Sequence, residues 1–471
     1  MTVSVKSSSS NFYFCESSMD LDYHCALRHL PAGCDTLVAT GATTRDGVTL
    51  FGKNSDREPN EAHHILILPA ADHAKSTLKC TYLEVPQAEH TYAVLLAKPF
   101  WIWVAEMGVN EKGVAIGNEA VFTRAPMDKK PGLIGMDLLR LALERAATAA
   151  EAVRVIVELL EQYGQGGNCG YQHKFYYHNS FLIADPFEAW VLETAAKQWA
   201  AKKISGVYSI SNGITIENQW DMASQNLVNY AIGKKWCKTT DFNFSACYSD
   251  SIFTTFSDCR KRRHRTMRQL TAHAGQLSPN SMMAILRDHD GEENYRPHRG
   301  LTGATVCMHA GYGPVRGSQT TGSMVCHLAP ERPTIFVTAT AAPCTSIYKP
   351  LWIDSSITSL THCPTGFYDD EAFFWQHEVL HRSLLPDYAT LIGAIRNDQI
   401  EIERKFVEDA LRLAQVSRDK RNVYANDCFS RALTLEKEWR ARLPQLRRIK
   451  SRRFLHALAW RRFNRKADVP V

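Results

Sequence analysis

A pair of adjacent amphipathic helical segments with short strand-like runs on both sides limits the possible folds more than any other feature of this sequence. Both segments lie within residues 136–163 and carry leucine, valine and isoleucine at helical spacing. Thr148 and Glu151 form a capping-box start for the second segment, and Gly164 ends it. The order of strands, two helices and strands again favours an α+β fold over a doubly wound parallel sheet. Strand-like runs lie at 36–39, 48–51, 92–96, 114–116, 181–184, 189–193, 207–210, 324–328 and 334–338.

The chain divides into three parts by local pattern. Residues 1–33 open with a serine run and show no sustained periodicity, which is typical of a leader or propeptide that is removed. Residues 34–360 hold the strands and the helical pair and are predicted to form the catalytic domain. Beyond about residue 369 the sequence becomes helical and charged, so residues 361–471 are predicted to form a helical extension with a basic tail.

Composition excludes several classes of protein. Of 471 residues, 45% are hydrophobic and 22% are charged, a balance that excludes wholesale disorder. No uninterrupted apolar run reaches the length of a transmembrane helix, so we expect no integral membrane association. The net charge is +6, but residues 440–466 alone carry 11 Lys/Arg and no Asp/Glu, which leaves −5 on the rest. The body is therefore not predicted to bind nucleic acid. The tail is expected to dock on the body or to be mildly disordered rather than to contact a membrane.

The cysteines indicate a reducing compartment. There are 13 of them, an odd number, and no C-x-x-C pair occurs anywhere. This pattern favours a cytoplasmic protein with reduced thiols and argues against zinc ribbons and redox pairs. We therefore expect no metal and no cofactor.

One short motif supports a different prediction. His377, Glu378 and His381 form a literal H-E-x-x-H, in which two histidines on one helical face share a zinc ion and the glutamate acts as general base. Glu401 and Glu403 are the candidate third ligands. The alternative interpretation is an amphipathic helix whose histidines contact a neighbouring domain.

A longer set of motifs resembles the secernin and dipeptidase branch of the N-terminal nucleophile (Ntn) hydrolases. The similarity is close over most of 34–211 and looser beyond. It implies an Ntn-hydrolase-like four-layer αββα sandwich, with two antiparallel sheets packed face to face between helical layers. The matching blocks are 34–36, 52–62, 70–73, 79–82, 103–111, 115–120, 135–138, 164–167 and 189–194.

The resemblance implies a cysteine nucleophile at Cys34. A free thiol titrates near pH 8.5, so it needs a base, and the α-amine of the same residue supplies one with a pKa near 7.7–8.0. Cys34 gains a free α-amine only if residues 1–33 are removed. Gly33 has no side chain, so its own carbonyl, which precedes Cys34, is accessible to attack by the Cys34 thiol.

Other site residues follow from the same resemblance. The carboxylate of Asp56 is expected to orient the amine, and the amide of Asn118 to donate into the oxyanion hole. Asn212 resembles a second active-site asparagine, with a turn before Gly213 as its alternative interpretation. Lys53 stands where bile-salt hydrolases and penicillin acylases carry arginine, and Glu119 is a candidate partner for a substrate ammonium.

The predicted function is a cysteine-type peptidase, most simply a dipeptidase acting on a small peptide substrate. One departure from the bile-salt hydrolases concerns an arginine near the end of the core that supports the nucleophile. Residues 320–324 stand there instead, and the nearest upstream arginine is Arg316. Two alternatives stay open, namely a non-hydrolytic secernin-like interaction protein and a zinc peptidase built on His377 and His381. The oligomeric state is open.

Overall fold

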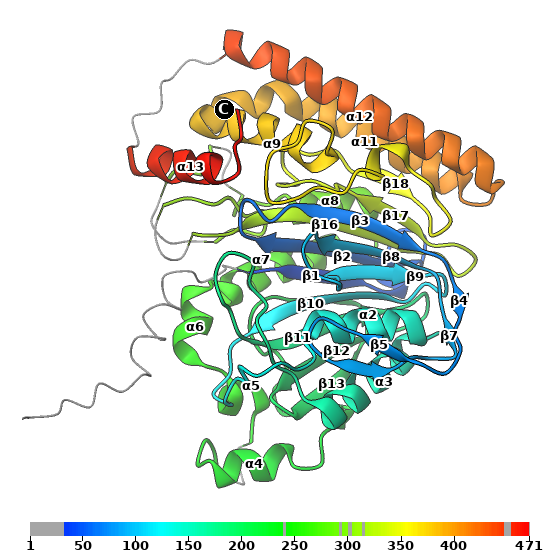
Figure 1. Cartoon of the computed structure of the whole chain (residues 1–471), viewed down its shortest axis with the longest axis vertical. Helices are drawn as coiled ribbons and strands as arrows, with labels where there is room; N and C mark the ends of the chain where they lie inside the picture. The colour runs from blue at the N-terminus through cyan, green and yellow to red at the C-terminus, as the bar shows by residue number, and fades with distance from the viewer. Residues whose placement is uncertain are drawn as a thin grey trace, which may run out of the picture.

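The computed structural model describes residues 33–238, 242–291, 294–299, 304–312, 316–446 and 454–470. The predicted leader, apart from Gly33, lies outside the described residues. Two antiparallel sheets form the centre of the molecule, and two short hairpin pairs, β4–β7 and β5–β6, accompany them (Figure 1). The hairpin strands are β4 (Ala71–Asp72), β5 (Thr77–Lys79), β6 (Glu84–Pro86) and β7 (His90–Thr91).

The six-stranded sheet carries the order β14-β1-β2-β16-β17-β18. Its central strands β1, β2 and β16 bring together segments from the two ends of the predicted catalytic region. The strands are β1 (Asp35–Ala39), β2 (Thr49–Arg57), β14 (Val207–Ile210), β16 (Gln319–Leu328), β17 (Thr334–Val337) and β18 (Lys349–Leu351).

The eight-stranded sheet has the order β15-β13-β12-β11-β10-β9-β8-β3 and faces the first sheet through β10 and β11. Alternate side chains of these strands fill the apolar core between the sheets, while the others face the helices. The strands are β3 (His63–Leu68), β8 (Val94–Pro99), β9 (Met107–Asn110), β10 (Ala115–Val121), β11 (His178–Ala184), β12 (Ala189–Ala195), β13 (Gln198–Ile204) and β15 (Met222–Ala223).

Helices cover the outer face of each sheet. The predicted helical pair forms α2 (Gly135–Arg145) and α3 (Ala149–Tyr163), which pack on the eight-stranded sheet. Thr148 Oγ1 accepts from the backbone N–H of Glu151, which confirms the predicted start of the second helix at Thr148. The Glu151 side chain accepts from the backbone N–H of Ala147, one residue before the cap, so the reciprocal bond of a full capping box is shifted by one position. Helices α7 (Cys259–Ala272) and α8 (Pro279–Leu286) pack on the six-stranded sheet. The predicted αββα sandwich is therefore confirmed. The shorter elements nearby are η1 (Gly41–Thr43), α4 (Leu227–Gly233), α5 (Phe244–Tyr248) and α6 (Ser251–Phe256).

The C-terminal helices gather beside β17 and β18 at one end of the molecule (Figure 1). The last of them, α13, docks on the chain itself: the indole of Trp460 donates to the carbonyl of Ala310, and the Asn60 amide donates to the carbonyl of Phe463. Residues 454–470 of the basic tail are therefore docked on the chain, which is one of the two outcomes expected ahead of membrane contact. No helix in the described ranges is both long enough and apolar enough to cross a membrane. The elements are η3 (Thr358–Leu360), α9 (Phe373–Leu384), η4 (Leu385–Asp387), α10 (Tyr388–Leu391), α11 (Gly393–Leu413), α12 (Arg418–Leu446) and α13 (Phe454–Lys466).

Candidate active site

Cys34 lies just before β1, where the two sheets face each other. The antiparallel register of β1 and β2 pairs Asp35 with Asn54, so Cys34 lies beside the end of β2. The backbone N–H of Asp56 donates to the Cys34 sulfur at 3.4 Å. Burial raises the pKa of the thiol to about 12; the charge of Lys53 opposes this shift, and the carboxylates of Glu106 and Asp56 add to it. A thiol in this environment is protonated at neutral pH, so a nucleophilic role requires a base at close range.

Asp56 is buried, and only one of its two carboxyl oxygens accepts a hydrogen bond from the described residues. The Thr320 hydroxyl donates to Oδ1 at 2.6 Å, whereas Oδ2 has no hydrogen-bond partner among the described residues. Burial raises the pKa of Asp56 well above its ordinary value, although Arg262 and Thr320 oppose the shift. A cationic donor beside Cys34 would satisfy this oxygen and favour the ionised carboxylate.

Lys53 and Glu119, two of the predicted site residues, form an ion pair with each other in the protein interior. The Lys53 ammonium lies 3.1 Å from Glu119 Oε1 and donates to the carbonyl of Asn118 at 2.8 Å. The Thr36 hydroxyl donates to the same glutamate oxygen. Burial raises the pKa of Glu119 to about 7 even though Lys53 opposes it. Glu119 thus already has a cationic partner, and its contact with a substrate ammonium stays a prediction.

A chain of side-chain amides orients Asn118. Its Nδ2 donates to Asn179 Oδ1 at 3.1 Å, and Asn179 in turn donates to Gln165 at 3.0 Å. One hydrogen of the Asn118 Nδ2 group remains for another acceptor, and Oδ1 of Asn118 has no partner in the described part of the chain. The amide is buried and held in one orientation, as a preorganised donor requires.

An arginine that the sequence analysis missed lies beside Cys34. Arg262 on α7 is fully buried, and its Nη1 donates to the carbonyl of Gly33 at 2.6 Å and to that of Cys34 at 3.1 Å. The same nitrogen forms an ion pair with Asp35 at 2.6 Å. Arg262 therefore supplies the positive charge that residues 320–324 do not. Arg316 instead donates to the carbonyl of His309.

The sequence around Arg262 contains one indication that this arginine is buried. It stands in a run of basic residues that is typical of a solvated helix face. Arg262, Thr266 and Leu270 nevertheless recur at four-residue spacing, and all three are buried. Arg262 therefore lies on the same helix face as Thr266 and Leu270, and only this spacing distinguishes it from the basic residues on the exposed face.

Asn212 lies directly over Gly33. Its Oδ1 accepts from Arg262 Nη2 at 2.7 Å and its Nδ2 donates to the carbonyl of Ala120 at 2.9 Å. A Cβ added to Gly33 would lie 1.3 Å from Asn212 Oδ1. The position before Cys34 is therefore one that only glycine fits while Asn212 keeps its contacts.

The H-E-x-x-H motif does not present two histidines to one metal ion. His377 contacts Glu436 through Nδ1 at 2.9 Å and Thr345 through Nε2 at 3.3 Å. His381 contacts Glu378 through Nδ1 at 3.0 Å and its other nitrogen lies 3.1 Å from His309.

The proposed third ligands of this motif lie elsewhere. Glu403 pairs with Arg287, and Glu401 is exposed on α11. The motif is therefore a buried packing face, as its alternative interpretation held.

His63, which borders the site at the start of β3, makes a testable prediction about acid stability. Burial, with the charges of Arg57 and Lys98, lowers its pKa to about 3. Below the unfolded value near 6.5 the unfolded chain binds more protons than the folded one, so stability falls as pH falls from 6.5 toward 3. Between pH 7 and pH 5 this residue should cost about 2 kcal/mol. In urea unfolding, the stability lost between pH 7 and pH 5 should be smaller by that amount in His63→Phe than in the wild-type chain. His264→Gln changes an exposed histidine and should lose as much as the wild type. Equal losses of stability in all three proteins would contradict the prediction.

Comparison with known proteins places this chain in a family. Residues 33–291, more than half of the chain, match the family model described as Peptidase family C69. A conjugated bile acid hydrolase from Clostridium perfringens has 14% identity and a TM-score of 0.42, with 68% of this chain and 92% of that protein covered. A penicillin V acylase from Agrobacterium tumefaciens has 14% identity and a TM-score of 0.41, with coverages of 68% and 86%. At such identities the assignment rests on the family match. The chain belongs to Peptidase family C69, the dipeptidase A family that includes the secernins.

Proposed function

We propose that this protein is a cysteine-type dipeptidase whose nucleophile is the thiol of Cys34 and whose general base is the α-amine of the same residue. The observation that carries the proposal is the unpartnered Oδ2 of Asp56 beside Cys34, whose sulfur accepts from the Asp56 backbone. An ammonium at the start of the chain would complete the hydrogen bonding of that buried carboxylate. Family membership supports peptide hydrolysis, and the geometry supports the identity of the nucleophile.

The free amine arises by self-cleavage between Gly33 and Cys34. The Cys34 sulfur attacks the Gly33 carbonyl carbon and forms the thioester C–S bond. The Gly33–Cys34 C–N bond breaks, and the proton lost by the thiol is transferred to the leaving Cys34 nitrogen. Water then hydrolyses the thioester, which releases Gly33 as a carboxylate and regenerates the thiol. Arg262 Nη1 lies 2.6 Å from the Gly33 oxygen, where negative charge develops during the attack.

Dipeptide hydrolysis uses the same groups after the leader has gone. The amine takes the thiol proton, the thiolate attacks the peptide carbonyl, and the ammonium then protonates the departing amine. The remaining hydrogen of the Asn118 amide is the proposed donor to the oxyanion, a contribution of about 3–4 kcal/mol for donors of this kind. Water hydrolyses the acyl-enzyme in a second step.

A cytoplasmic location fits the reduced cysteines and stays a prediction.

Intact mass measurement combined with a dipeptide panel tests the proposal. The active protein should begin at Cys34, and the mass should fall by that of residues 1–33. Hydrolysis by a chain that still retains the leader would contradict the α-amine mechanism. A processed chain that hydrolyses no dipeptide would favour the non-hydrolytic alternative instead.

Gly33→Ala should slow self-cleavage without unfolding the core. The added Cβ collides with Asn212 Oδ1, so Asn212 must move and loses its bond to Arg262. A displacement of about 1 Å in such a site costs on the order of 10²-fold in rate. The measurement is the fraction of processed chain over time by intact mass. Gly233→Ala is the matched control, because its Cβ meets nothing within 4 Å; processing of Gly33→Ala at the control's rate would show that the close approach is irrelevant.

A further inference from the structure

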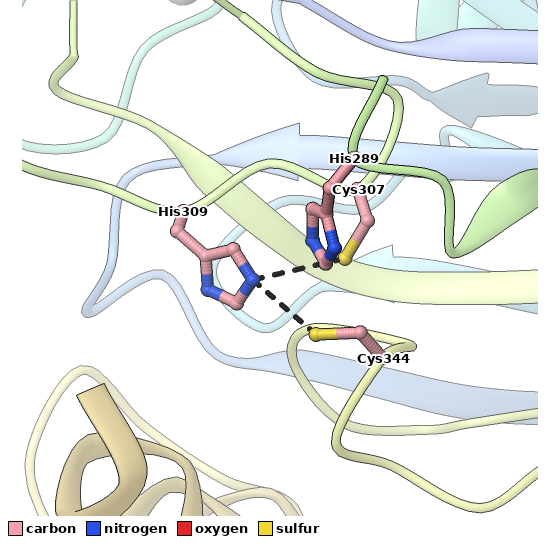
Figure 2. A group of neighbouring side chains, drawn as sticks. All are labelled: His289, Cys307, His309 and Cys344. Carbon is pink, nitrogen blue, oxygen red and sulfur yellow. Dashed lines mark hydrogen bonds between the residues drawn. The ribbon is translucent and has the colours of Figure 1, made fainter. Parts of the chain in front are cut away.

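Four metal-binding side chains meet outside the candidate active site. They are His289 after α8, Cys307 and His309 before β16, and Cys344 between β17 and β18 (Figure 2). One ligand atom from each lies within 4.8 Å of all the others, and all four residues are buried. Figure 2 shows both sulfurs facing the same nitrogen of His309. The set is Cys₂His₂, the composition of many structural zinc sites.

The distances suit a tetrahedral ion. His309 Nε2 lies 3.2 Å from the Cys344 sulfur and 4.0 Å from the Cys307 sulfur. Zinc–sulfur and zinc–nitrogen bonds of about 2.3 and 2.0–2.1 Å place tetrahedral S and N ligands about 3.6 Å apart. The two observed separations lie on either side of that value, so a small shift of the side chains would place an ion among them.

The surroundings of His309 leave its Nε2 lone pair pointing at the sulfurs. Arg382 donates to Glu378, which is thus an ionised acceptor, and His381 Nδ1 donates to the same carboxylate. The other nitrogen of His381 then accepts from His309 Nδ1, at 3.1 Å. This network assigns the proton of His309 to Nδ1 and leaves Nε2 as an acceptor or metal ligand. Histidines that bind a metal usually donate their other N–H to an acceptor that fixes the ring. His381, itself held by Glu378, is that acceptor for His309.

His289 supplies a second, independent observation. Its ring is buried and stacks on Tyr295 at 4.0 Å between centroids. Its Nε2 has no hydrogen-bond partner within the described ranges. A buried imidazole nitrogen without a partner has given up its hydrogen bond to water, a loss that a metal bond would remove. Two thiolates, two neutral imidazoles and one Zn²⁺ also sum to zero charge, which a buried site requires.

We propose that His289, Cys307, His309 and Cys344 bind a structural zinc ion. The residues are separated along the chain, and the C-x-x-C spacing that usually marks such sites is missing, which is why the sequence analysis expected no metal. The proposal also explains the H-E-x-x-H motif. His381 and Glu378 do not bind the ion but hold the imidazole that does.

The site is linked to the candidate active site through backbone contacts. The backbone N–H of Met308, between two of the ligands, donates to the Thr320 hydroxyl at 2.9 Å, and that hydroxyl donates to Asp56. The amide of Asn54 donates to the carbonyl of Val306 at 2.8 Å. Zinc would therefore anchor the segment that holds β2 in place. The metal site itself does not depend on the proposed peptidase activity.

Metal content and cobalt substitution test the proposal. The full chain, purified without a polyhistidine tag or chelators, should contain about one zinc per chain by mass spectrometry of the metal. Replacement by Co²⁺ should give thiolate-to-cobalt charge transfer and the visible bands of a tetrahedral ion. Titration of the wild-type thiols with a mercurial should release the zinc in step, a measurement that needs no variant.

Variants sharpen the assignment. Cys307→Ser together with Cys344→Ser should abolish the thiolate-to-cobalt band, whereas Cys428→Ala, another buried thiol, should keep it. His381→Phe should weaken zinc binding by about 10–100-fold while leaving the ligand set intact. The proposal is overturned if the wild-type chain takes up neither zinc nor Co²⁺ in stoichiometric amount. It is also overturned if the purified chain carries a Cys307–Cys344 disulfide, or if the double serine variant retains the cobalt spectrum.

Discussion

Cys34→Ala should abolish dipeptide hydrolysis and leave residues 1–33 attached. The thiol is the attacking group in both reactions, so no other side chain can replace it. Loss of a nucleophile in this role lowers the rate by roughly 10⁴–10⁶-fold. Intact mass reports the uncleaved leader, and a fluorogenic or chromatographic dipeptide assay reports the activity.

The controls separate chemistry from folding. Cys326→Ala removes a buried thiol from β16 in the same sheet and should leave processing complete, with only a modest loss of stability. The unfolding midpoint of Cys34→Ala in urea should stay near that of the wild-type chain, because the exchange removes only one sulfur. Substantial dipeptide turnover by Cys34→Ala would reject Cys34 as the nucleophile.

Arg262→Met should destabilise the protein by about 3–5 kcal/mol and stop self-cleavage. The guanidinium is fully buried and pairs with Asp35, so its removal leaves a buried carboxyl without its partner. It also removes the donor to the Gly33 carbonyl. Urea unfolding measures the first effect and intact mass the second.

The pH dependence of Arg262→Met follows from Asp35. Burial already raises the pKa of Asp35 to about 6 although Arg262 opposes it, and loss of the arginine raises that pKa further. An acid with a raised folded-state pKa contributes stability at low pH that is lost as pH rises through that pKa. The deficit of Arg262→Met should therefore be larger at pH 8 than at pH 5.

Two further variants make this result specific. Asp35→Asn in the Arg262→Met background should recover part of the loss at pH 8, because no buried charge then remains. Arg260→Met on the same helix is the matched control, since that arginine is exposed. A loss below about 1 kcal/mol for Arg262→Met, or equal losses for both arginines, would contradict the assigned role.

Local pattern predicted the secondary-structure elements, and neighbouring strands bring part of the candidate site together. Alternation in strands and leucine spacing in α2 and α3 act over a few residues, and so does the Thr148 cap. Cys34, Lys53 and Asp56 also belong together for a local reason, because a single hairpin pairs β1 with β2. These features depend on neighbours along the chain, which any reader of the sequence can see.

Long-range packing decided the rest. Arg262 reaches Gly33 across 229 positions, and its basic helix looks solvated until α7 is placed on the sheet. His309 contacts Cys344, which lies 35 positions away in the sequence, and His381, which lies 72 positions away. The two histidines of the H-E-x-x-H motif are only four positions apart, but they have different partners and do not face one ion. Which buried charge meets which partner depends on sheet register and on helix packing. Both are set by the burial of the whole core, so no short stretch of sequence contains them.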